Sequence, residues 1–130
     1  MTQRIKRLQS NDLTPLEQVC ASQRKAEPLD NLQQIVVGRG NPHARLMLIG
    51  EAPGAEEAAR GLPFVGRSGQ LLSELMIEAG LDEQHDLYIC NVIKCRPPRN
   101  RKPTSREIAI ARPWLQQQID LIDPALVLLA

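Results

Sequence analysis

The sequence predicts an α/β fold in which helices cover both faces of a central parallel sheet, a three-layer α/β/α arrangement. Short apolar runs suited to buried strands occur at residues 46–49, 87–93 and 125–129. Segments with helical periodicity separate these runs, and alternation of this kind is typical of a parallel sheet. Because the third run lies next to the chain end, we expect the sheet to be incomplete at the C-terminus.

The first run, residues 46–49, is followed by two glycine-rich loops and then by a helical pattern. Apolar residues recur at helical spacing between residues 71 and 79. Ser68 is the expected N-cap of this helix, and Gly80 is the expected residue just after its C-terminus.

The second run, residues 87–93, leads into a basic and proline-rich loop. Thr104 and Glu107 then have the spacing of a capping box, which predicts a helix from about residue 105 to residue 122. Pro113 lies inside this segment and is expected to kink it, because proline lacks an N–H and its ring strikes the preceding turn. The third run follows as a strand.

The chain divides into two parts by composition. Residues 1–34 are polar and weakly periodic, which predicts an N-terminal segment of helix and loop. Residues 35–130 carry the α/β pattern. We expect this domain to be truncated, since a natural domain rarely ends directly after a core strand.

The composition is that of an ordinary soluble domain, with a net charge of +1 and no global basic field. Aromatic residues make up 2% of the chain, which excludes a base-stacking surface built from several rings. No apolar run is long enough for a bilayer, and no secretory signal follows the charged N-terminus. We therefore expect a cytoplasmic monomer that does not contact membranes and, in that reducing compartment, forms no disulfide.

Candidate functional residues lie in loops that follow the strands, where ligands bind in open parallel sheets. Gly50, Glu51 and Gly54 follow the first strand, Phe64 lies in the next loop, and Asn91 ends the second strand. A carboxylate, a flat ring and a carboxamide suit the recognition of a pyrimidine. The alternatives are a tight turn with a solvated glutamate, a core phenylalanine, and an asparagine that bonds nearby backbone.

The loop after the second strand carries five basic residues and no acidic one. Local positive charge of this kind suits contacts with DNA phosphates, although a solvated loop is the alternative. The candidate phosphate-binding residues are Lys94, Arg96, Arg99, Arg101 and Lys102.

Together these residues resemble the iron–sulfur, or family 4, uracil-DNA glycosylases. The string GEAPGAEEAARGLPFVGRSGQLL is similar to the first signature of that family, and ICNVIKCRPPRNRKPT is similar to the second. The resemblance covers residues 38–130. It implies an enzyme of base excision repair that flips deoxyuridine out of DNA and hydrolyses its N-glycosidic bond.

The resemblance also implies roles for individual residues. Gly50, Glu51 and Gly54 lie where the first loop of the family meets the uracil and the attacking water, with Glu51 as the catalytic candidate. Phe64 matches the aromatic residue that stacks on uracil, and Asn91 matches the amide that discriminates it. Uracil-containing DNA is the implied partner.

The family holds a [4Fe–4S] cluster with four cysteines, and this sequence departs from that set. Cys20 and Cys95 match two of the ligands, whereas Gln23 and Ala111 stand at the other two positions. Cluster irons need thiolates, so we expect the cluster to be absent or unstable here. A later His-Pro-Ser motif of the family is also missing from the sequence.

Two other hypotheses stay open at this point. The chain could be an inactive, truncated remnant that at most binds DNA. It could also be a small-molecule enzyme that binds a nucleotide phosphate at its glycine-rich loops, although the basic loop and the pairing of Phe64 with Asn91 argue against this.

Overall fold

The computed structural model describes residues 35–130, so the predicted N-terminal segment lies outside the described residues. The elements are β1 (Arg39–Gly40), β2 (Leu46–Gly50), α3 (Ala55–Arg60), α4 (Arg67–Glu78), α5 (Glu83–Asp86), β3 (Leu87–Asn91), the 3-10 turn η1 (Pro98–Asn100), α6 (Ser105–Ile122) and β4 (Leu126–Leu129).

The strands form one open sheet in the order β1-β3-β2-β4. Strand β2 runs parallel to both β3 and β4, which confirms the predicted parallel pairing, and Gly50 lies opposite Asn91 in the register. The short strand β1 pairs antiparallel with β3, so the sheet is mixed and mostly parallel rather than wholly parallel.

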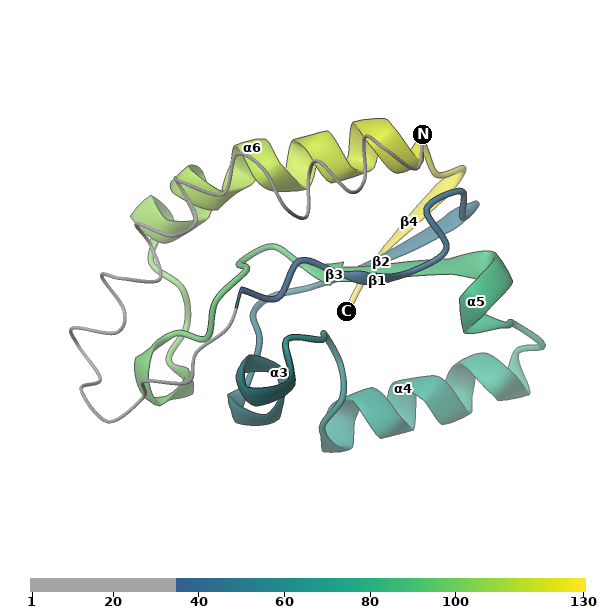
Figure 1. Cartoon of the computed structure of the whole chain (residues 1–130), viewed down its shortest axis with the longest axis horizontal. Coiled ribbons are helices and arrows are strands. Elements are labelled where there is room, and N and C mark those ends of the chain that lie inside the picture. The colour runs from purple at the N-terminus through teal and green to yellow at the C-terminus, as the bar shows by residue number, and fades with distance from the viewer. Residues whose placement is uncertain (1–34) are drawn as a thin grey trace.

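Helices cover both faces of the sheet, as predicted. Figure 1 shows α6 across one face and α3 and α4 on the opposite face. Alternate residues of the buried strands point to these two layers. Met47 and Ile49 pack with Ile122 of α6, whereas Leu48 packs with Leu72 of α4 on the other face.

The helix ends agree with the sequence in part. Helix α6 begins with the predicted capping box, in which Thr104 Oγ1 accepts from the Glu107 N–H, and it continues through Pro113. The N-cap of α4 is Gly66, so the prediction that Ser68 caps this helix is wrong. Gly80 follows the C-cap with a φ of 77°, in the left-handed region that glycine adopts without strain.

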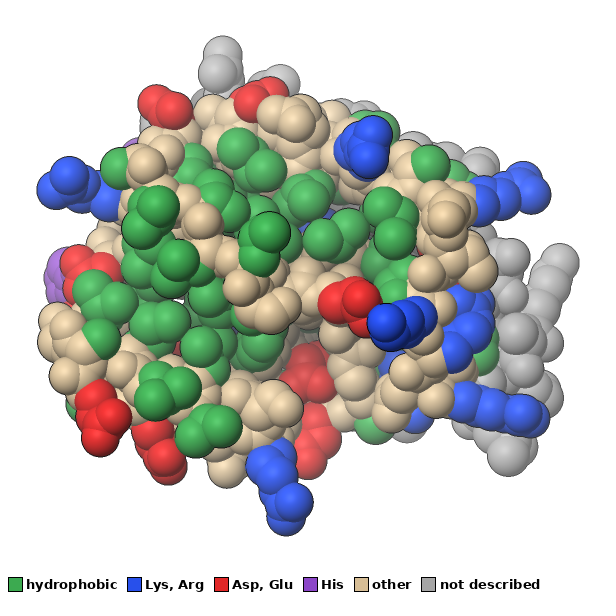
Figure 2. Space-filling model, turned by 180° about the vertical axis from the view of Figure 1, so that it is seen from behind, with side chains coloured by type: hydrophobic (Ala, Val, Ile, Leu, Met, Phe, Trp, Pro, Cys, Tyr) green, Lys and Arg blue, Asp and Glu red, His purple; other side chains and the backbone are tan. Residues whose placement is uncertain are grey.

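Strand β4 forms one edge of the sheet, and its side chains are exposed. Figure 2 shows apolar side chains gathered over much of one face of the molecule. Among the described residues, the exposed large apolar side chains come mainly from α4 and β4. None of the helices in residues 35–130 is long and apolar enough to cross a membrane.

Candidate functional site

A cavity of about 290 Å³ opens at the carboxyl ends of β2 and β3, where the sequence predicts the site. Its size is close to the lower end for small-molecule sites, roughly 300 Å³. The lining includes every candidate base-binding residue, namely Gly50, Glu51, Gly54, Phe64 and Asn91. The structure therefore brings together side chains that are up to 41 positions apart in the sequence, and the roles assigned to them stay predictions.

Gly50 lies between the ring of Phe64 and the carboxamide of Asn91. A Cβ atom at this position would overlap Cζ of Phe64 and Oδ1 of Asn91, so a side chain here would push both groups away. Because Gly50 has no side chain, the ring of Phe64 and the amide of Asn91 can both pack against its backbone.

Asn91 offers its carboxamide to the cavity. The residue is 3% exposed, and within the described residues no hydrogen bond joins its side chain to another group. Its backbone carbonyl does have a partner, because Lys94 Nζ donates to it at 2.6 Å. The alternative in which the Asn91 side chain bonds nearby backbone is therefore not observed among the described residues, and the amide is available to a ligand.

Phe64 has an unusual backbone conformation for an aromatic residue. Its φ is 55°, in the left-handed region where a bulky side chain is strained, and such residues concentrate at functional sites. One part of the half-buried ring packs near Leu48 and Ile89, and another part lines the cavity. The packing agrees with the core interpretation of Phe64, and its role as a stacking surface stays a prediction.

Gly69 of α4 holds Phe64 from below by close backbone packing. A Cβ atom at Gly69 would overlap the carbonyl group of Phe64, so the first turn of α4 lies directly against this residue. Replacement of Gly69 by a larger residue would displace the strained segment.

Glu51 is exposed at the mouth of the cavity. Its backbone carbonyl accepts from the Ile93 N–H at 3.0 Å. This bond joins the loop after β2 to the segment just after β3. Among the described residues its carboxylate has no hydrogen-bond or ion-pair partner. The acid group is thus free to act on a bound molecule or on water.

Lys94 is not a surface residue of the basic loop. It is 1% exposed, and its Nζ donates to the Asn91 carbonyl and, at 2.5 Å, to Oε1 of Gln118 in α6. Burial lowers the pKa of Lys94 to about 8. The prediction that Lys94 contacts phosphate is therefore wrong, because its ammonium group is used inside the protein.

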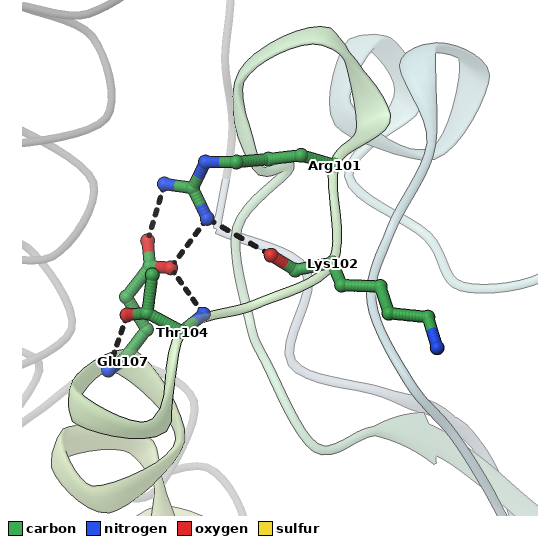
Figure 3. Close-up of polar contacts among 4 residues, drawn as sticks. All are labelled: Arg101, Lys102, Thr104 and Glu107. Atoms are coloured by element: carbon green, nitrogen blue, oxygen red, sulfur yellow. Dashed lines mark hydrogen bonds and ion pairs between the residues drawn. The ribbon is translucent and has the colours of Figure 1, made fainter.

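Arg101 lines the cavity and pairs with a carboxylate of the protein. Its Nη1 lies 2.7 Å from Oε1 of Glu107, and Nη1 also donates to the Lys102 carbonyl, as Figure 3 shows. The hydrogen bond with Glu107 raises the pKa of Arg101. A phosphate would have to share this guanidinium with Glu107.

The other three basic residues differ in exposure. Arg99 and Lys102 are exposed, and the Lys102 side chain extends away from the Arg101–Glu107 pair in Figure 3. Arg96 is half-buried, and its Nε donates to Oδ1 of Asn100 at 2.9 Å. Arg99, Arg101 and Lys102 are therefore the exposed members of the predicted phosphate-binding set.

The described residues do not fit a four-cysteine iron–sulfur cluster. Ala111 is 1% exposed and packs with Ile93 and Trp114 in an apolar cluster, where it offers no ligand atom. Residues 35–130 contain no group of three or more His, Cys, Asp or Glu side chains placed to hold a metal. Cys20 and Gln23 lie outside the described residues.

The two described cysteines have different states. Cys90 is a free, buried thiol whose pKa burial raises, in agreement with a structural role. Cys95 is disulfide-bonded. The expectation that the chain forms no disulfide is therefore wrong for this structure.

Glu57 bonds to two loops of the cavity, and the sequence analysis did not identify it. Its carboxylate accepts from the backbone N–H groups of Gly54, Val65 and Gly66, at 3.0, 2.9 and 2.7 Å. Burial acts to raise the pKa of Glu57, but the backbone hydrogen bonds outweigh it and the pKa is lowered. The one available signal was its place three residues after Gly54, the capping position of α3.

Comparison with known proteins identifies relatives of the chain. Residues 37–130 match the family model described as the Uracil DNA glycosylase superfamily. A type-4 uracil-DNA glycosylase of Thermotoga maritima is 50% identical over 97 residues, which cover 75% of this chain and 50% of the relative. One from Archaeoglobus fulgidus is 41% identical over 104 residues, covering 80% and 52%.

Similarity extends to a second type of the same enzyme. A type-5 uracil-DNA glycosylase of Thermus thermophilus is 35% identical over 108 residues, which cover 73% of this chain and 49% of the relative. The chain spans about half the length of the curated relatives it matches.

Proposed function

The chain belongs to the uracil DNA glycosylase superfamily, and from this premise we propose that it binds uracil flipped out of DNA and takes part in hydrolysing the N-glycosidic bond of deoxyuridine. The observation that carries the proposal is the cavity at the sheet edge, because Glu51, Phe64 and Asn91 all line it. A base stacked in a duplex cannot reach such a cavity. Flipping is therefore required, at a cost of a few kcal/mol.

The carboxamide of Asn91 is the proposed specificity group. Uracil presents an N–H donor at N3 and an acceptor at O4, and an amide supplies the complementary acceptor and donor. Cytosine inverts this pattern, so a carboxamide held in one orientation would be left with unpaired polar groups. The unpartnered side chain of Asn91 supports this role.

The ring of Phe64 is the proposed stacking surface for the flipped base. A single aromatic ring can supply roughly 1–3 kcal/mol by stacking on a base. The strained φ of 55° supports a functional role, since strain is usually retained where the geometry of a site requires it.

Glu51 is the proposed catalytic carboxylate. When uracil departs as an anion, cationic character develops on the sugar, and a nearby carboxylate stabilises it or orients the attacking water. The exposed position of Glu51 at the cavity mouth supports this assignment, because the sugar lies between the flipped base and the DNA backbone.

The basic loop is the proposed contact with the DNA backbone. Arg99 and Lys102 are exposed on it, and Arg96 and Arg101 lie beside them. Uracil-containing DNA is thus the proposed partner, with phosphate contacts that position the strand and base contacts that select the nucleotide.

We propose that this chain works without a stable [4Fe–4S] cluster. Ala111 is enclosed by apolar neighbours at one family ligand position, and alanine has no atom that can bind iron. The proposed base recognition, stacking and catalytic roles all belong to protein side chains.

The similarity to type-4 and type-5 uracil-DNA glycosylases supports the enzyme over the DNA-binding remnant. It also argues against a small-molecule enzyme of unrelated class.

The test uses a fluorescent DNA single strand with one uracil, incubated with the purified chain and then treated with alkali. We expect cleavage at the uracil, and none in a strand with cytosine at that position. Asn91→Leu should abolish cleavage, whereas Gln117→Leu, which removes an exposed carboxamide on α6, should not. An intact uracil strand after treatment with the unaltered chain would contradict the proposal.

A further inference from the structure

The Glu57 carboxylate joins two loops that both contribute residues to the cavity lining. Oε1 accepts from the Gly54 N–H in the loop after β2. Oε2 accepts from the N–H groups of Val65 and Gly66 in the loop that carries Phe64. Since Gly54 and Phe64 both line the cavity, one side chain connects two of its walls.

The glycines at 54 and 66 leave room for this carboxylate. A Cβ atom on Gly54 would lie 2.9 Å from Oε1 of Glu57, and one on Gly66 would lie 3.3 Å from Oε2. Both distances are tighter than ordinary contacts, so larger residues at either position would press on the carboxylate. The absence of side chains at positions 54 and 66 therefore accommodates the Glu57 side chain between the two loops.

The hydrogen bonds act on the residues that directly follow Phe64. Its φ of 55° is strained, so the segment needs contacts that hold it in place. Glu57 holds the two residues after Phe64, and Gly69 packs against the carbonyl of Phe64 itself. These contacts hold the backbone that follows Phe64, and so restrict the movement of its ring.

A carboxylate suits this position better than an amide of the same shape. All three partners are N–H donors, and an ionised carboxylate accepts at both oxygens. Glutamine would present one oxygen and one NH₂ group, so a donor would face a donor at Gly54 or at Val65 and Gly66. The lowered pKa of Glu57 agrees with an ionised group that accepts on both sides.

We propose that Glu57 is a positioning residue for substrate recognition, which fixes the Phe64 ring in its base-stacking orientation and ties it to the Gly54 loop. This inference rests on the proposed function, because it assigns the ring to the flipped base. Glu57 does not line the cavity, so its effect passes through Phe64 and Gly54.

The first experiment needs no substrate. It measures amide hydrogen exchange of Val65 and Gly66, which reports whether their hydrogen bonds to Glu57 are formed in the folded protein. We expect Glu57→Ala to speed exchange at both amides by about ten-fold or more, with a smaller effect for Glu57→Gln. Glu56→Ala, an exposed acid one residue earlier, is the matched control and should leave both rates unchanged. Equal exchange in Glu57→Ala and the unaltered protein would overturn the inference.

The second experiment is a double-mutant cycle on uracil excision, with Glu57→Ala and Phe64→Leu made singly and together. We expect Glu57→Ala to lower kcat/KM by about ten-fold, and to have little further effect once Phe64 is leucine, because coupled residues are not additive. Additive losses would show that Glu57 acts independently of the ring and would overturn the inference.

The two experiments separate the inference from the proposed function. If the unaltered chain excises no uracil, the proposed function fails and the substrate role of Glu57 fails with it. Amide exchange would still decide whether Glu57 holds the Phe64 segment. Loss of exchange protection together with a non-additive cycle supports both.

Discussion

Gly50 is the residue over which the ring of Phe64 and the amide of Asn91 meet. The neighbouring strand places Asn91 opposite Gly50 in the register, and the loop after α3 brings Phe64 to the same point. Strand pairing brings the asparagine to this point, whereas a strained backbone conformation turns the ring toward it. The missing side chain at position 50 is what allows both.

Gly50→Ala should reduce uracil excision by at least about ten-fold, equivalent to roughly 1.4 kcal/mol of transition-state stabilisation. The added methyl group would overlap Phe64 and Asn91 and separate them. Steady-state kinetics on a uracil-containing strand measures the effect, and urea unfolding checks that the variant is folded. Unchanged kcat/KM in a folded variant would contradict the described packing.

Glu57 should make stability depend on pH in a defined direction. Its pKa is lowered from the ordinary 4.5 in the folded state, so its contribution is fully present above that pH and is lost as the pH falls through the folded value. The difference in free energy of unfolding between the unaltered protein and Glu57→Gln should therefore shrink in acid. Urea titrations from neutral to acid pH measure it, with Glu56→Gln as the control. The same pH dependence in both variants would contradict the argument.

A buried polar network joins the C-terminal end of strand β3 to helix α6. Lys94 donates to the Asn91 carbonyl and to Gln118, and Gln118 Nε2 in turn donates to the Val37 carbonyl and to the Tyr88 hydroxyl. The network fixes the end of β3 against α6. It thereby holds the backbone of the proposed specificity residue.

Lys94→Met should lower the free energy of unfolding by about 1–3 kcal/mol, because the Asn91 carbonyl and Gln118 Oε1 lose their buried donor. Lys102→Met removes an exposed lysine eight residues later and should change it by roughly 0.5 kcal/mol or less. Urea unfolding compares the two. Similar values for both variants would show that the buried ammonium group is not holding these acceptors.

The elements show which parts of the structure the sequence could predict. Strands β2, β3 and β4 carry apolar runs, and α6 has a capping box, so all were found with nearly the right bounds. Strand β1 consists of Arg39 and Gly40 and has no apolar pattern, so nothing marked it. The six residues of α3 are mostly polar or small and offer no amphipathic stripe.

The site was predictable where one residue type suggested one chemistry. Glu51, Phe64 and Asn91 could be grouped because parallel strands end at the same edge. Glu57 and Lys94 could not be assigned correctly, because their partners are not visible in the local sequence. Glu57 binds backbone N–H groups eight and nine residues further on, and Lys94 binds a glutamine 24 residues away.

The whole chain belongs to the superfamily, but it lacks cysteine at two positions where the sequence resemblance implies cluster ligands. The cavity brings together the residues that the sequence resemblance predicts for the site, whereas Ala111, where the resemblance implies a cluster ligand, lies in apolar packing. The geometry of the cavity depends on β2, β3 and the loops that follow them.

The purified protein should therefore contain no stoichiometric iron and no visible absorption from a cluster. Gln23→Cys/Ala111→Cys restores cysteine at both altered positions and is the matched comparison, in which we expect iron to increase. Iron analysis and absorption spectra of both proteins provide the measurement. A full cluster in the unaltered chain would contradict the assignment of Gln23 and Ala111 as lost ligands.

We propose that the cavity lined by Phe64 and Asn91 recognises uracil by its hydrogen-bonding edge. The most direct test is a nuclear magnetic resonance titration of the folded chain with free uracil and, separately, with free cytosine, observing the Asn91 side-chain NH₂ signals. We expect uracil to shift these signals and those of Phe64 and Gly50, and cytosine to leave them in place. Equal shifts with both bases, or shifts confined to residues away from the cavity, would contradict the claim.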